Sequence, residues 1–273
     1  MLTPSALQAA DPIKIVLIAG ATKKVDRPGH HDYLAGCRLL QNLLQQTSGI
    51  EAILIIEDWP ADESIFKGAK SIVFYTDGAG KQAYLTNPQR VATIQKLADE
   101  GVGIVSLHQA VEFPPQLAKL SLDWTGAVYK KPRAGRGHWD SSHNQFPDHP
   151  VSHGVSPWKI NDGWLNGFTF VNDMKGITPL VWSGKTHVGS QQGGEKDVVA
   201  WIFDRANGGR SFNFSGLDAH SAFENAGMTQ LLVNSILWTA KLPVPKEGFH
   251  CQANKTLIDS FLTPRTSPKA KKH

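Results

Sequence analysis

Histidine is the residue type in this sequence that could most readily do chemistry. The chain holds eleven histidines. His31 lies in the loop after the first predicted strand, His108 directly follows the fourth, and His220 comes just after the last. Imidazoles and a carboxylate can together hold a transition metal, and an imidazole that titrates near neutral pH can act as a general acid or base. We therefore expect His31, His108 and His220 to be catalytic residues, or the ligands of a divalent transition metal such as zinc.

A carboxylate partner is expected at Glu112, four residues after His108. If the segment after the strand turns helical at once, both side chains lie on one face and can act together in catalysis. Further carboxylates occur in the predicted loops, at Asp32, Asp77, Asp140, Asp162 and Asp218. The spacing matches no strong metal motif such as HExxH or a paired CxxC. Acid–base catalysis without a metal therefore stays open, as does a set of histidines that only satisfy loop backbone groups.

Substrate contacts are expected mainly from a long segment rich in His, Trp, Gly and Pro that follows the fourth strand. Tryptophan rings can stack on the apolar face of a sugar, although tryptophan is equally common in protein cores. The residues predicted to bind the substrate are His138, Trp139, Asp77, Asp162 and Trp164.

Short apolar runs alternate with helical patterns along the first half of the chain. Buried strands are predicted at 13–19, 53–56, 71–75 and 102–107, and amphipathic helices at 34–44 and 88–98. Two more strands, at 197–203 and 210–214, precede a final helix at 228–240. This order predicts a flavodoxin-like, three-layer α/β fold with a mostly parallel central sheet. In such sheets ligands bind beyond the carboxyl ends of the strands, which is where the three histidines fall.

The chain is predicted to contain one domain. Residues 1–12 are expected to be a flexible N-terminal segment, and residues 13–242 to form the α/β domain with an insertion at about 113–195. Within the insertion, short strands are predicted near 126–129, 167–171 and 179–182. Residues 243–273 are rich in proline and lysine and are expected to be an extended or disordered basic tail.

Composition limits the classes of partner. The formal net charge is +4, and much of that excess lies in the tail, so no basic face interleaved with aromatic residues predicts nucleic-acid binding. No apolar run approaches the ~18 residues of a transmembrane span. The small residues at 5–10 resemble the surroundings of a signal-peptide cleavage site, which favours a periplasmic or secreted protein over a cytoplasmic one and leaves the compartment open.

Several segments in order along the chain resemble the ThuA-like (trehalose-utilisation) family of the class I glutamine amidotransferase-like superfamily. They include the sequence PGHHDY at 28–33, GVGIVSLH at 101–108 and DHPVSHGV at 148–155. The sequence LLVNSILWTA at 231–240 matches as well. The resemblance runs from about residue 13 to residue 245 and implies a flavodoxin-like sheet and a role in carbohydrate metabolism. It also implies a sugar oxidoreductase as a partner, and a homo-oligomer is a further candidate assembly.

Glutamine hydrolysis is not expected. The superfamily places a nucleophilic cysteine at a sharp strand-to-helix turn, whereas this chain has Leu107, His108 and Gln109 there and no cysteine nearby. The resemblance instead implies an enzyme acting on a sugar or an oxidised (keto-) sugar or glycoside, as a hydrolase, lyase or isomerase. His108 at the turn suits a base or a ligand.

The alternative function is a non-catalytic carbohydrate-binding or accessory protein with a degenerate active site. Two departures from the family pattern motivate it. Similar sequences carry Asp-Glu where this chain has Asp162-Gly163, so a carboxylate is missing. After the last strand similar sequences carry a Gly-His pair, and here only His220 remains.

Overall fold

The computed structural model of the 273-residue chain describes residues 11–21, 29–183 and 197–264. Most of the N-terminal segment predicted to be flexible, residues 1–10, lies outside the described residues, as do residues 265–273 of the predicted tail.

A seven-stranded, mostly parallel sheet forms the centre of the molecule, in the order β2-β1-β3-β4-β11-β10-β9. The neighbouring pairs from β2 to β11 are parallel, and β10 is antiparallel to both of its neighbours. The α/β, flavodoxin-like prediction is confirmed. The strands are β1 (Ile13–Ala19), β2 (Ile50–Ile55), β3 (Ala69–Tyr75), β4 (Gly103–Leu107), β9 (Ile177–Ser183), β10 (Asp197–Asp204) and β11 (Arg210–Phe214).

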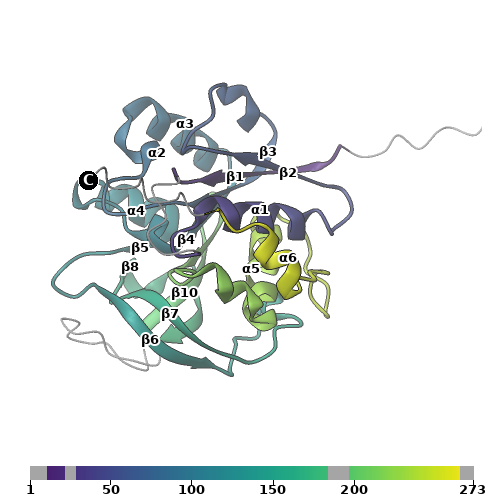
Figure 1. Cartoon of the computed structure of the whole chain (residues 1–273). Helices are drawn as coiled ribbons and strands as arrows, with labels where there is room; N and C mark the ends of the chain where they lie inside the picture. The colour runs from purple at the N-terminus through teal and green to yellow at the C-terminus, as the bar shows by residue number, and fades with distance from the viewer. Residues whose placement is uncertain (1–10, 22–28, 184–196, 265–273) are drawn as a thin grey trace, which may run out of the picture.

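Helices cover both faces of this sheet and complete the three layers. On one face lie α1 (Tyr33–Leu44) and α5 (Ala226–Thr239), and on the other lie α3 (Pro88–Asp99) and α4 (Ala118–Thr125). Figure 1 shows α1 and α3 on opposite sides of β1 and β3. The short helix α2 (Ala83–Thr86) precedes α3.

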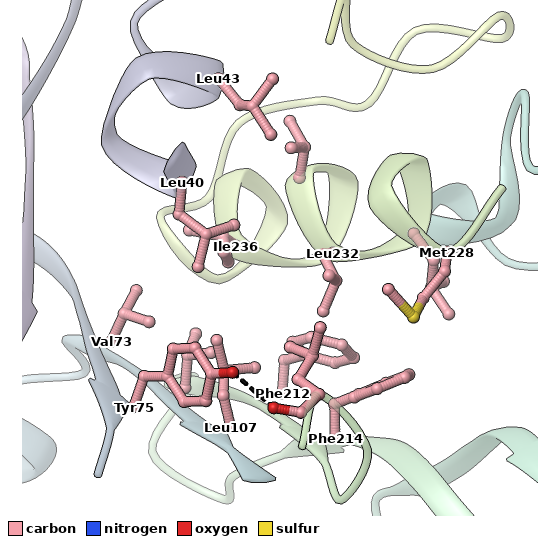
Figure 2. Packing of buried hydrophobic residues seen from close by; sticks show 14 of the residues in the cluster. Leu40, Leu43, Val73, Tyr75, Leu107, Phe212, Phe214, Met228, Leu232 and Ile236 are labelled. Atoms are coloured by element: carbon pink, nitrogen blue, oxygen red, sulfur yellow. Dashed lines mark hydrogen bonds between the residues drawn. The ribbon is translucent and has the colours of Figure 1, made fainter. Parts of the chain in front are cut away.

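Two hydrophobic clusters fill the spaces between the layers, because successive strand residues point to opposite faces. Val73 and Tyr75 of β3 face α1 and α5, whereas Ile72 and Phe74 face α3 and α4. Figure 2 shows the first cluster, in which Leu40 of α1 and side chains of α5 pack over the ends of β3, β4 and β11. The helices are therefore fixed on the sheet by apolar contacts, which places the loops between them.

A long β-hairpin within the predicted insertion was not anticipated. Its strands β6 (Gly135–His143) and β7 (Trp158–Asn166) pair in an antiparallel register that sets His138 opposite Gly163 and Trp139 opposite Asp162. The shorter strands β5 (Ala127–Val128) and β8 (Thr169–Phe170) also pair with each other. The 3-10 helices are η1 (Glu63–Phe66), η2 (His108–Val111), η3 (Pro115–Leu117), η4 (Pro150–Ser152), η5 (Asn172–Met174) and η6 (His220–Glu224).

Residues 243–264 differ from the extended or disordered tail predicted for this part of the chain. They include the helix α6 (Lys255–Ser260), whose first turn is capped by the Asn254 side chain accepting from the Leu257 N–H. Ile258 is buried in the cluster beneath α5. Thr263 donates through its backbone N–H and its hydroxyl to Asp32. The segment is held in place because apolar residues recur between its polar ones.

Within the described ranges, no helix combines the length and the apolar character needed to cross a membrane.

Candidate functional site

Four neighbouring strands of the sheet, β1, β3, β4 and β11, end at one edge of the molecule. The loops that follow them carry His31, Asp77, His108 and Asp218. Parallel strands place their carboxyl ends together, so residues far apart in the sequence meet at this edge. The sequence-based expectation that His31 and His108 lie at a common sheet edge matches their place in the fold.

The carboxylate of Asp218 is the centre of a cluster of histidines. Its Oδ1 lies 2.6 Å from His31 Nε2 and 3.3 Å from His108 Nε2. Its Oδ2 lies 2.7 Å from His30 Nδ1 and 2.9 Å from His138 Nε2. The Asp218 side chain is only 6% exposed, whereas those of His31 and His138 are 43% and 52% exposed. We name these five residues the Asp218 cluster; it has a buried floor and a solvent-facing rim.

Asp162 of the hairpin holds the backbone of the loop that carries Asp218. Its carboxylate accepts from the N–H groups of Leu217, Asp218 and Ala219 at 2.6, 3.0 and 3.4 Å. Asp162 is buried, and burial raises its pKa although the nearby His108 and the N–H groups of Leu217 and Gly163 act in the opposite direction. The hairpin thus contributes to the site from both strands, with His138 from β6 and Asp162 from β7.

The backbone at the site adopts unfavourable conformations. His31, His108 and Leu217 all have positive φ angles, of 49°, 55° and 70°. Non-glycine residues seldom adopt this region, and such strain is found preferentially at functional sites. At His108 the sharp turn from β4 into η2 aims the imidazole back over the end of β11, where Nδ1 lies 3.2 Å from the Ser215 carbonyl oxygen and 3.1 Å from that of Gly216.

Electrostatics keep Asp218 ionised. Burial alone would raise the pKa of its carboxyl, but the imidazoles of His108, His31 and His138 outweigh that effect and hold the pKa far below its usual range. A permanently charged carboxylate among imidazoles can orient them, stabilise a protonated one or bind a cation.

Two groups of side chains in the cluster have the donor set of a transition-metal site. One consists of His31, His108 and Asp218, and the other of His30, His138 and Asp218. In each group the ligand atoms lie within 4.8 Å of one another. Imidazole nitrogen with carboxylate oxygen suits zinc and related ions. A His/Asp cluster that could hold a metal is therefore present.

Glu112 and Asp77 lie beside the cluster and outside both ligand groups. Glu112 Oε2 is 3.2 Å from Arg136 Nη1, and burial raises the pKa of this carboxyl while Arg136 lowers it. Asp77 Oδ1 accepts from the Tyr33 hydroxyl at 2.9 Å, and the Tyr33 ring stacks on His31. The two carboxylates flank the histidines from the loops after β3 and β4.

His220, expected at the centre of the site, is placed elsewhere. Its Nε2 lies 2.8 Å from the carbonyl oxygen of Ile258 in α6, and the side chain is buried and outside both ligand groups. The reason is local: the His220 N–H donates to the Gly29 carbonyl and η6 begins here, which turns the side chain toward the C-terminal segment.

Trp139 and Trp164 are also buried. They are 4% and 1% exposed and belong to the cluster between the sheet, α1 and α5. Of the two interpretations left open by the sequence, sugar stacking or core packing, their positions in this structure correspond to core packing.

The sequence reasoning gave no central role to two members of the cluster, Asp218 and His30. In the sequence Asp218 is one of several loop carboxylates, and of the adjacent pair His30 and His31 only His31 is predicted as a site residue. The one feature of the sequence that relates to these two residues is the glycine at position 163, which pairs with His138 across the hairpin. A Cβ there would lie 2.7 Å from Asp218 Cβ and 3.1 Å from His138 Nε2, so this position must be glycine for the cluster to close.

Solved structures of similar shape include a ThuA-like protein from Parabacteroides merdae. It is 15% identical and has a TM-score of 0.60, with 84% of this chain and 90% of that chain covered. A ThuA-like protein from Bacteroides uniformis is 13% identical and has a TM-score of 0.58, with coverage of 87% and 95%. At these identities the likeness concerns the fold alone.

No curated protein matches the sequence. A family model does: the ThuA model, described as trehalose utilisation, matches residues 16–239, which include every member of the Asp218 cluster. The chain therefore belongs to the ThuA family.

Proposed function

We propose that this protein is a carbohydrate-processing enzyme that acts on a sugar, or on an oxidised (keto-) sugar or glycoside, at the Asp218 cluster. The reaction would be a hydrolysis, an elimination or an isomerisation. The observation that carries the proposal is the ring of four imidazoles around one ionised carboxylate, at the carboxyl edge of the sheet. Membership of a family described as trehalose utilisation supports a sugar as the substrate class.

Keto-sugars suit such a site because the carbonyl acidifies the neighbouring C–H bond. A histidine base removes that proton, and the electron pair moves into the carbonyl oxygen to give an enolate. Return of a proton to the opposite face of the same carbon inverts that carbon and completes an isomerisation, here an epimerisation. When the enolate instead expels the glycosidic oxygen, a second histidine supplies the proton that this leaving group takes up. The half-exposed His31 and His138 are placed to meet a substrate from solvent.

The buried residues would position these groups. His108 directs Nδ1 at two backbone carbonyls, which leaves Nε2 as its basic or ligating atom toward Asp218. Glu112, which pairs with Arg136, is a second carboxylate at this edge of the sheet that would position the catalytic groups. A divalent ion such as zinc, held by two of the histidines and Asp218, would polarise the carbonyl oxygen of the substrate.

The surroundings of Gly163 argue against the alternative function, a non-catalytic carbohydrate-binding protein with a degenerate active site. Similar sequences carry a glutamate at this position. Here the Asp218 side chain occupies the space into which a side chain at position 163 would project. The cluster therefore keeps a central carboxylate, supplied by a different strand end.

The test is turnover of paired glycosides and keto-glycosides in D₂O, followed by proton NMR. We expect deuterium uptake at the carbon next to the carbonyl, or cleavage, only for the keto compounds. His31→Gln should lower the rate by about 10²–10⁴-fold, the usual worth of a general acid or base. His250→Ala, at an exposed histidine outside both ligand groups, should not. Binding of sugars without exchange or cleavage, with or without added zinc, would refute the enzyme and favour the accessory protein.

A further inference from the structure

The two oxygens of the Asp218 carboxylate have separate sets of partners. Oδ1 faces the Nε2 atoms of His31 and His108, and Oδ2 faces His30 Nδ1 and His138 Nε2. The two three-residue ligand groups have Asp218 as their common member. The arrangement has the form of a carboxylate bridge with two imidazoles on each side.

Each half has the composition of an open metal site. Catalytic zinc sites use three protein ligands and keep the fourth position for water or substrate. Zinc–ligand bonds of ~2.0–2.2 Å in a tetrahedron separate neighbouring ligand atoms by roughly 3.3 Å. The nitrogen–oxygen distances here run from 2.6 to 3.3 Å. An outward shift of up to about 0.7 Å would therefore seat an ion in each half. Three of the four histidines are exposed enough to make that shift.

The hydrogen bonding of His108 points to a cation independently. Its Nδ1 is within hydrogen-bonding distance of two backbone carbonyls, so Nδ1 carries the proton of the neutral ring. The lone pair of Nε2 then points at the charged Asp218 carboxylate. This buried nitrogen has no hydrogen-bond partner among the described residues. Two electron-rich atoms 3.3 Å apart call for a positive charge between them, which a metal ion or a proton on Nε2 would supply. Metal-bound histidines commonly donate their other ring N–H to a backbone carbonyl, as His108 does.

The surroundings of Asp218 would support a bridge. Outer partners of ligating carboxylates fix their orientation. Asp162 clamps the backbone on both sides of Asp218, and Gly163 leaves the space that the Asp218 side chain fills. Paired catalytic metals typically lie ~3.5–4 Å apart, a separation that the two oxygens of one carboxylate can span.

We propose that Asp218 bridges two divalent transition-metal ions, one held by His31 and His108 and the other by His30 and His138. The inference rests on the proposed function in taking the Asp218 cluster as the working site, and adds the number of ions and their ligands. The ion in the His30–His138 half is the more accessible to solvent, because neither of its histidines is buried.

The experiment is a zinc titration of the chelator-treated full-length protein, with metal measured by elemental mass spectrometry after dialysis. We expect about two ions per chain in the wild type. The double variant His30→Ala/His138→Ala should keep about one, and Asp218→Ala should lose tight binding of both. His250→Ala is the control and should keep both. Manganese loading adds a second readout, since two bridged Mn²⁺ ions give a spin-coupled EPR spectrum that the double variant lacks.

One ion per chain in the wild type, unaffected by the double variant, would overturn the bridge, and so would absence of metal binding. Neither a single ion nor the absence of metal would contradict the proposed function. Deuterium exchange into a keto-glycoside is measured separately and does not require a metal. Conversely, two ions without sugar turnover would leave the bridge standing and remove the proposed function. Circular dichroism of each variant separates loss of ligands from loss of fold.

Discussion

Asp218 is the residue on which the candidate site depends, and its importance comes from its position in space. One carboxylate contacts four imidazoles from three separate parts of the chain. The sequence identifies His31 and His108 as chemical residues because they follow predicted strands, and His138 because it lies in the histidine- and tryptophan-rich insertion. It cannot tell which of several loop aspartates they surround, since that depends on the conformation of the loop after β11. The same loop conformation turns His220 away toward α6.

Gly163 gives a residue-scale prediction. In Gly163→Ala the new methyl group would overlap Asp218 Cβ, which lies 2.7 Å from the ideal Cβ position, and would crowd His138. We expect a loss of about 1–3 kcal/mol in the free energy of unfolding, the usual cost of overpacking, measured by urea denaturation. The control Asn161→Ala is exposed on the same strand and should change stability by less than about 0.5 kcal/mol. Equal stability of the glycine variant and the wild type would contradict the assigned crowding.

The β6–β7 hairpin is the element that the sequence did not reveal. Its strands read GRGHWDSSH and WKINDGWLN, so polar residues occupy many positions and the apolar alternation of a half-buried strand is weak. Part of the buried face is itself polar: Ser141 and His143 are buried beside Trp158 and Trp164. The main-sheet strands, by contrast, are short apolar runs, and their positions were predicted to within a few residues.

His143 gives the hairpin a pH dependence. Burial lowers the pKa of this imidazole to about 4, from an ordinary value of about 6.5. Below pH 6.5 the unfolded chain takes up a proton here that the folded chain does not, so folding stability falls as the pH drops toward 4. Between pH 7 and pH 4 this group alone should cost about 3 kcal/mol.

The measurement is the free energy of unfolding of the wild type and His143→Gln by urea denaturation at several pH values. His143→Gln keeps a polar group near Ser141, whose Oγ lies 2.8 Å from His143 Nε2. The variant should be less stable at pH 7, and its stability should fall less steeply toward pH 4. Parallel curves for the two proteins would show that the His143 imidazole does not contribute to the acid sensitivity.

At the scale of the whole molecule, the fold could be predicted from local patterns and the site only in part. Strand and helix order determine a parallel sheet with its carboxyl ends together, and that placed His31 and His108 at one edge. The hairpin that brings His138 and Asp162 over this edge pairs residues far apart in sequence, and no local pattern records such pairing. The C-terminal segment differs from the prediction for a similar reason. Its helix α6 packs against η6 and shares a hydrophobic cluster with α5, and Thr263 beyond the helix donates to Asp32.

The central claim is that the Asp218 cluster is the working site of a carbohydrate-processing enzyme, and Asp218→Asn tests it most directly. This change keeps the shape of the side chain and removes its charge, and Asp140→Asn on the exposed face of the hairpin is the matched control. The measurement is kcat for turnover of a keto-glycoside by folded protein. We predict a fall of about 10²–10⁴-fold for Asp218→Asn and no change for Asp140→Asn. Wild-type turnover by folded Asp218→Asn would contradict the account.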